Sequence, residues 1–123
     1  MISTKTKGVA GEHFACYDSF LLGIPCYFSD ESQQYDLLMD YNKVLKVQVK
    51  ASNKGSKRSI RFNPNTPSKS NYDTIDLFAF VWLDGGQIAW LPRTETNIYN
   101  HYINKTLFQD YTLERALSMI ESR

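Results

Sequence analysis

Two neighbouring segments within residues 35–50 alternate apolar and polar side chains, and this pattern constrains the fold more than any other feature of the chain. The odd-numbered positions are apolar and most of the even-numbered ones are polar, which is typical of two half-buried β-strands. In an antiparallel pair, odd-numbered residues of the two strands lie opposite one another only if the residue numbers of each opposite pair add up to an even number. One such register pairs Leu37 with Val47 and Asp36 with Gln48. The sequence therefore predicts a β-hairpin with one apolar and one polar face.

The predicted register also specifies the turn of this hairpin. An even sum excludes a two-residue turn and requires a three-residue connection over residues 41–43, Tyr-Asn-Lys. Asn42 is the better candidate for the left-handed conformation that such a loop uses, because Asn adopts positive φ more readily than Lys. The polar face of the hairpin then carries Asp36, Gln48 and Lys50 together.

The charge of the chain is distributed unevenly. The net charge of all 123 residues is +1, but residues 41–72 contain eight Lys or Arg and no acid, while residues 1–40 and 73–123 have net charges of −4 and −3. Such a local excess of positive charge is typical of a surface that binds a polyanion. Residues 51–72, rich in Gly, Pro, Ser and Asn, are predicted to form a basic loop. A solvated loop without a ligand is the alternative, and the position directly after Gln48 and Lys50 favours the polyanion.

The remaining segments suggest a sheet with flanking helices. Apolar spacing predicts a helix over residues 8–22, ended by Gly23 and Pro25, and a closing helix capped by Thr112. Further strands are predicted at residues 24–28, 59–62, 75–83 and 87–91. This order predicts one domain over residues 1–123, an α/β or α+β fold with a mixed central sheet flanked by helices.

Two further features bear on where the protein acts. No apolar run approaches the roughly 20 residues that a membrane span requires, and the start MISTKTKG lacks the apolar core of a secretory signal. We therefore expect a soluble intracellular protein, cytoplasmic or nucleoid-associated, with no membrane partner. Cys16 and Cys26 occur in unrelated segments and are expected to be buried, reduced thiols.

The polar groups of the hairpin are those that metal-dependent phosphodiester hydrolysis needs. Asp36 offers a carboxylate, and the adjacent strand offers the side-chain carbonyl of Gln48 and the backbone carbonyl of Val49, all suitable ligands for Mg²⁺. Lys50 can hold a phosphate oxygen or help to deprotonate the attacking water. Glu12 can bind a second ion or orient water. The alternative is structural: Glu12 compensates a helix dipole, and the other groups form a solvated polar face.

Three runs of sequence, KGVAGE, YDLLMD and KVQVKAS, together resemble the core motifs of the PD-(D/E)XK nuclease superfamily. In such enzymes a helix acid precedes an Asp on the second strand and an acid-x-Lys on the third. The Gly-x-x-Gly-Glu opening, the Gln in place of the acid and the Lys-Ala-Ser ending are most similar to the group I intron-associated homing endonucleases. Archaeal Holliday junction resolvases are the next most similar. The resemblance covers roughly residues 7–92 and implies a restriction-endonuclease-like αβββαβ-type core.

The resemblance also implies an activity, the hydrolysis of double-stranded DNA by a Mg²⁺-dependent endonuclease, with Mn²⁺ as a substitute ion. The residues with an expected catalytic role are Glu12, Asp36, Gln48 and Lys50. The expected metal ligands are Asp36, Val49, Gln48 and Glu12. The residues expected to contact DNA are Lys7, Ser52, Lys54, Lys57, Arg58 and Arg61. Gln48 stands where most members have an acid, so the metal site lacks one negative charge.

Three functions remain open from the sequence. The leading one is a site-specific homing endonuclease, and we expect a homodimer or homotetramer because a small chain covers little duplex and two nicks need two active sites. A Holliday junction resolvase would use the same residues on four-way junctions. A catalytically inactive DNA-binding protein would keep the fold and the basic loop without cutting.

Overall fold

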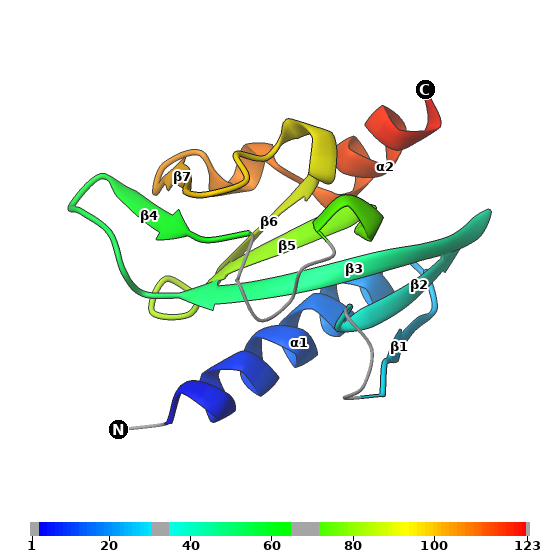
Figure 1. Ribbon diagram of the computed structural model, residues 1–123, viewed down its shortest axis with the longest axis horizontal. Helices are drawn as coiled ribbons and strands as arrows, with labels where there is room; N and C mark the ends of the chain where they lie inside the picture. Colours follow the sequence, from blue (N-terminus) through cyan, green and yellow to red (C-terminus); the bar gives the residue numbers. More distant parts are fainter. Residues whose placement is uncertain (1–2, 31–34, 65–71, 123) are drawn as a thin grey trace.

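A five-stranded mixed sheet forms the centre of the computed structural model, which describes residues 3–30, 35–64 and 72–122 (Figure 1). The elements are α1 (Thr4–Leu21), β1 (Cys26–Phe28), β2 (Leu37–Tyr41), β3 (Lys43–Ser52), β4 (Ser59–Phe62), β5 (Leu77–Trp82), β6 (Gln87–Pro92), β7 (His101–Asn104) and α2 (Leu113–Glu121). Short 3₁₀ helices are η1 (Tyr72–Thr74), η2 (Arg93–Glu95) and η3 (Phe108–Asp110). Neither helix of the described residues is long and apolar enough to cross a membrane.

The strand order confirms the predicted mixed sheet. The central sheet runs β1-β2-β3-β5-β6, with β3 and β5 parallel and every other neighbouring pair antiparallel. A second, two-stranded sheet pairs β4 with β7. The connection from β3 to β5 contains β4 and η1 in its described part, where the αβββαβ-type core would have a helix.

The hairpin of β2 and β3 has the predicted register and turn. Leu37 pairs with Val47 and Tyr41 with Lys43, and Asn42 has a φ of 58°, the left-handed conformation expected of it. The odd-numbered apolar residues of both strands are buried in one cluster. The paired ladder begins at Leu37, so Asp36 lies just before it rather than in a strand pair with Gln48.

Helix α1 packs on the sheet through small residues. Ser3 caps the helix at its start, which is why it begins at Thr4 and not at residue 8. Of the apolar residues whose spacing predicts the helix, Ala15 is buried, but Val9, Phe20, Leu21 and Leu22 are exposed. The other buried residues of the helix are Gly11, Cys16 and Ser19. Small side chains let the helix backbone approach the sheet closely, so the large apolar residues are left on its outer side.

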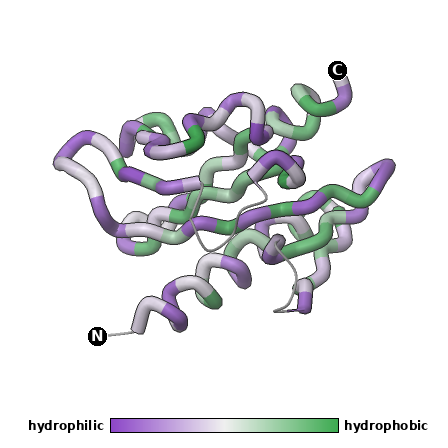
Figure 2. Tube along the Cα trace, viewed as in Figure 1, coloured by the Kyte–Doolittle hydropathy of each residue, from purple (hydrophilic) through white to green (hydrophobic). Residues whose placement is uncertain are grey.

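Two apolar clusters lie on opposite faces of the central sheet. The first contains buried residues of α1 and α2 together with those of β2, β3 and Trp90. The second contains Phe78, Phe80 and Phe108 with Ile60 and Ile103 of the small sheet. Figure 2 shows hydrophobic residues concentrated in the central strands and hydrophilic ones along the connection from β3 to β4. The molecule therefore has three layers: two helices, the five-stranded sheet and the small sheet.

The described part of the predicted basic loop at residues 51–72 contains strand residues. Its first two residues belong to β3, and Ser59–Phe62 form β4 as predicted. Lys69 lies outside the described residues. Because Gly55 forms an isolated bridge to Ile60, the segment between β3 and β4 is held alongside β4.

The two cysteines are free and buried, as predicted, but their settings are related. Burial, together with the neighbouring Cys16 thiol, which hydrogen-bonds with it, raises the pKa of Cys26 to about 12. Cys16 lies in α1 and Cys26 in β1, so no local sequence pattern relates them. The packing of α1 against β1 brings them together.

A pair of glycine substitutions tests the close packing of α1. A Cβ atom at Gly11 would lie 3.0 Å from the Cβ of Ala51 and 3.4 Å from a methyl group of Val49, whereas a Cβ at Gly8 would have no neighbour within 4 Å. We expect Gly11→Leu to lower the free energy of unfolding by about 1–3 kcal/mol through overpacking. Gly8→Ala should raise it by about 0.5–1 kcal/mol through helix propensity.

Urea denaturation of the two variants and of the wild type measures both effects. Equal effects of the two substitutions would contradict the close contact of α1 with β3.

Candidate functional site

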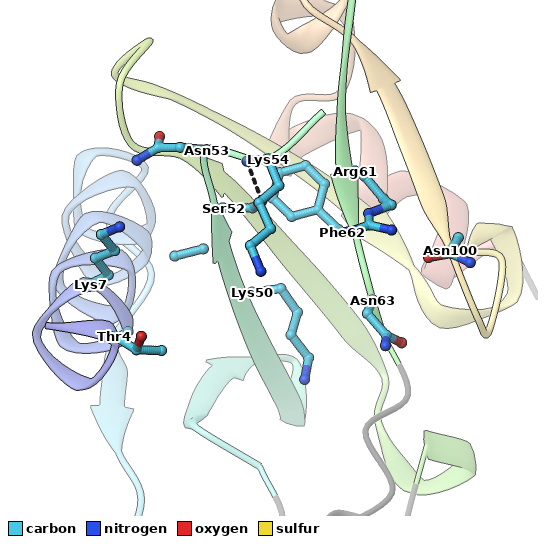
Figure 3. Close-up of a pocket in the computed structure, with 12 residues that line it drawn as sticks. Thr4, Lys7, Lys50, Ser52, Asn53, Lys54, Arg61, Phe62, Asn63 and Asn100 are labelled. Atoms are coloured by element: carbon cyan, nitrogen blue, oxygen red, sulfur yellow. Dashed lines mark hydrogen bonds between the residues drawn. The ribbon is translucent and has the colours of Figure 1, made fainter. Parts of the chain in front are cut away.

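A cleft of about 510 Å³ lies among the start of α1, the C-terminal half of β3 and β4 (Figure 3). Five residues with a predicted functional role line it: Lys7, Lys50, Ser52, Lys54 and Arg61. Figure 3 shows Lys50 and Lys54 between α1, which carries Lys7, and β4, which carries Arg61. The cleft therefore brings together residues from four segments of the chain.

The lining of the cleft is strongly basic. It contains the side chains of Lys7, Lys50, Lys54 and Arg61 and, among the residues described, no Asp or Glu. Positive charges from several elements converge here. A cleft with charges of one sign and low-dielectric walls focuses its potential and attracts the opposite charge. This part of the surface is suited to a polyanion.

Asp36 is held against β3 by two hydrogen bonds. Its N–H donates to the carbonyl oxygen of Val47 at 2.9 Å, and its carboxylate oxygen Oδ2 accepts from the N–H of Val49 at 2.8 Å. A residue in a strand directs its N–H and C=O toward the same neighbouring strand. The carbonyl of Val49 therefore points to the same edge of β3 as its N–H. Two predicted metal ligands, the Asp36 carboxylate and the Val49 carbonyl, face this edge together.

Glu12 is brought to β3 by the close approach of α1. The adjacent Gly11 packs against Val49 and Ala51 at the point where the helix crosses the strand. Glu12 is half-buried, and it follows directly the residue that touches β3. This packing puts the predicted helix acid beside the half of β3 that carries Lys50.

Gln48 differs from its predicted setting. The hairpin pattern predicts Gln48 on a polar face, but this side chain is only 5% exposed. In the parallel register, Gln48 is the partner of Phe78 and Lys50 is the partner of Phe80, so both lie on the face that holds the second apolar cluster. The even-numbered face of β3 is therefore covered at Gln48 and opens into the cleft at Lys50 and Ser52.

The oxygen groups near β3 fit a small divalent cation that keeps part of its water shell. No group of three or more His, Cys, Asp or Glu side chains suited to a metal occurs in residues 3–30, 35–64 and 72–122. Mg²⁺ needs only one or two protein carboxylates and fills its remaining positions with water and substrate phosphates. Asp36 and the Val49 carbonyl can supply two ligands, and Glu12 is the nearest further carboxylate by packing.

Some predicted residues lie elsewhere, and other residues were missed. Lys57 and Arg58 are exposed but do not line the cleft. The lining residues without a predicted role are Thr4, Gly8, Ala51, Asn53, Phe62, Asn63 and Asn100. Asn100 comes from the segment before β7, far from the hairpin in sequence, and no local pattern signals its position. The pairing of β7 with β4 brings it to the cleft.

Substitution of Asp36 tests the bond that fixes this carboxylate. Asp36→Ala leaves the N–H of Val49 without its acceptor, and we expect a loss of about 1–3 kcal/mol in the free energy of unfolding. Asp36→Asn keeps a side-chain oxygen for the same bond and should lose less. Chemical denaturation of the two variants measures the difference, and equal losses would show that the bond to Val49 does not carry the effect.

His101 links β7 to the second apolar cluster. Its ring stacks on Phe80 with centroids 5.3 Å apart, and its Nδ1 accepts from the N–H of Asn97 at 3.1 Å. Burial lowers the pKa of His101 from its ordinary value of 6.5. The unfolded chain therefore binds this proton at a higher pH than the folded protein does. Stability from the neutral ring is full above pH 6.5 and falls as the pH drops through the interval between the two pKa values.

Thermal unfolding across this pH range tests the role of His101. We expect the wild type to lose stability below pH 6.5 relative to its value at neutral pH. His101→Phe keeps an aromatic ring against Phe80 and should lose less over the same range, because it has no proton to bind. The contributions of the carboxylates are common to both proteins and cancel in the difference. Parallel curves for the two proteins would contradict the lowered pKa.

Comparison with known proteins gives a match to a solved structure. No protein-family model matches the sequence, and no curated protein matches it either. The chain is similar to a solved structure described as that of a bacterial homing endonuclease, I-Ssp6803I, with a TM-score of 0.75 and 19% sequence identity, over 100% of both chains. At this identity the likeness concerns the fold: the chain has a homing-endonuclease-like fold, a mixed sheet flanked by two helices.

Proposed function

We propose that this protein is a metal-dependent endodeoxyribonuclease that cuts double-stranded DNA at specific sites, as a homing endonuclease does. The observation that carries the proposal is the juxtaposition of a basic cleft with the edge of β3 where Asp36 is bonded to Val49. The fold shared with a solved homing endonuclease supports it. A polyanion in the cleft would bring a phosphate to Lys50, one residue from Val49.

Each part of the proposed site has a physical role. Lys7 and Lys54 neutralise backbone phosphates and hold the duplex in the cleft, and Arg61 contacts its phosphates or bases. Lys50 contacts the phosphate that is cut and orients the attacking water. Asp36 and the Val49 carbonyl would hold Mg²⁺ or Mn²⁺. When bound, the ion supplies charge neutralisation at the phosphate and a lower pKa for the attacking water.

The remaining two predicted residues act at the margins of this site. Glu12, beside the crossing of α1 and β3, orients water or assists with the metal. Gln48 contributes no charge, and its amide oxygen is the neutral counterpart of the carboxylate found in related enzymes. We further propose a homodimer or homotetramer, since cutting both strands of a duplex requires two copies of one site.

A second function has an observation in its favour. The described residues lack a cluster of three metal-binding side chains, and Gln48 replaces an acid. A catalytically inactive DNA-binding protein of the same fold would have these properties. The proposed activity and this alternative differ in a measurable result, the appearance of cut DNA ends.

Cleavage of a randomised duplex library tests the proposal without knowledge of the target sequence. The wild type is incubated with the library and Mg²⁺, and new DNA ends are captured by adapter ligation. We expect cut ends with Mg²⁺ and none with EDTA. Lys50→Met should reduce the yield at least about 100-fold, as does the loss of a group that acts at the reacting phosphate.

Lys43→Met is the matched control, because Lys43 is an exposed lysine at the opposite end of the same strand. It should cut like the wild type. Undiminished cleavage by Lys50→Met would contradict the assignment of the site, and DNA binding without cut ends would favour the inactive protein. Preferential cutting of a synthetic four-way junction, added in parallel, would instead indicate a junction resolvase.

A further inference from the structure

Strands β4 and β7 form a two-stranded ribbon with one buried and one exposed face. Ile60 pairs with Ile103, and each is 1% exposed. Arg61 pairs with Tyr102; Arg61 is exposed, and Tyr102 is 59% exposed. Residues directly opposite one another in an antiparallel pair share a face. The ribbon therefore packs its apolar face on the central sheet and presents Arg61 and Tyr102 side by side to solvent.

The backbone of β4 in this ribbon is held on both of its edges. On one edge β4 pairs with β7; on the other, the N–H of Arg61 donates to the carbonyl oxygen of Lys54 at 2.9 Å. Gly55 packs so closely that a Cβ there would lie 2.1 Å from the carbonyl oxygen of Ser59. The inner face joins the second apolar cluster through Phe62, beside Phe80. Such a support holds exposed side chains in place before a ligand arrives.

Arg61 and Tyr102 are also the polar groups of the outer face that have no structural task. Neither side chain makes a hydrogen bond or ion pair with another described residue. By contrast, the Oδ1 atom of Asn104 accepts from the N–H and hydroxyl of Thr106 at 2.9 and 2.8 Å, so this side chain stabilises the turn after β7. A rigid ribbon with two uncommitted recognition groups is suited to a ligand.

The position of Arg61 connects the ribbon with the basic cleft. Arg61 lines the cleft that contains Lys50, and it also lines a shallow hollow on the outer side of the ribbon, with Tyr102 and Ser59. The exposed cations Lys57 and Arg58 lie in the segment just before β4. A duplex in the cleft would therefore continue across the outer face of the ribbon, with these cations available for its phosphates.

We propose that the β4–β7 ribbon reads base sequence in the major groove of duplex DNA, with Arg61 recognising a guanine and Tyr102 contacting the neighbouring base. The major groove admits a two-stranded β-ribbon, and a bidentate contact of Arg with the O6 and N7 atoms of guanine is the commonest specific contact there. Lys57 and Arg58 hold the flanking phosphates and fix the register of the ribbon. This inference rests on the proposed function and assigns its sequence specificity.

Selection of bound duplexes from a randomised library, in EDTA so that no cutting is needed, tests the ribbon separately from catalysis. The full chain is used, as wild type, Arg61→Lys, Tyr102→Phe and the control Arg115→Lys, at an exposed arginine of α2 outside the cleft and the ribbon. Arg61→Lys keeps the charge but loses the planar fork that pairs with guanine. We expect it to lose roughly tenfold or more of the preference at one or two base positions, with affinity for random duplex almost unchanged.

Tyr102→Phe should alter the preference at an adjacent position, while Arg115→Lys should keep the wild-type motif because Arg115 belongs to neither the cleft nor the ribbon. The proposal is overturned if the wild type selects no motif, if Arg61→Lys selects the wild-type motif, or if Arg61→Lys weakens binding to all sequences equally. Thermal unfolding of each variant verifies that the fold is kept. A selected motif without cut ends in the library experiment would leave this inference in place and reject the nuclease activity alone.

Discussion

The register of the β2–β3 hairpin is the constraint on which the rest of the site depends. Because Leu37 pairs with Val47, the β2–β3 ladder starts one residue after Asp36. The N–H of Val49, on the edge of β3 that faces β2, therefore has no partner in the paired part of β2. The Asp36 carboxylate takes that place at 2.8 Å. A slip of one residue would turn the apolar face toward solvent, so the burial of Leu37, Met39 and Val47 also fixes the position of this carboxylate. The stability of the core and the geometry of the site thus have one cause.

How much could be predicted from the sequence depends on how far apart in the chain the interacting residues lie. The hairpin, its turn at Asn42 and the strand at residues 59–62 were predictable because their signals lie within a few residues of one another. The buried side of α1 was not, because Gly11 and Ala15 are buried through close backbone approach rather than through large apolar side chains. The pairing of β4 with β7 and the contact of Cys16 with Cys26 join distant segments, and no local period encodes such contacts.

The electrostatics show why the net charge of a chain is a poor guide to its ligand. A net charge of +1 over 123 residues suggests no preference for a polyanion. Folding nevertheless collects Lys7, Lys50, Lys54 and Arg61 around one cleft, including a lysine from a helix in the acidic first third of the chain. None of the described acids of residues 1–40 lines the cleft, and Asp36 accepts a hydrogen bond from the backbone N–H of Val49. The field at the cleft depends on these nearby charges, since charges more than about 10 Å away are screened at ordinary ionic strength.

The burial of Gln48 gives a physical reason for an amide at this position. The side chain is 5% exposed and lies beside the second apolar cluster. A carboxylate so deeply buried would lose several kcal/mol of hydration unless a cation compensated it. An amide carries no net charge and needs only hydrogen-bond partners. An acid in the same place would couple folding to the binding of a cation, whereas an amide does not. In the proposed site, Gln48 would therefore bind a metal ion more weakly than a carboxylate would.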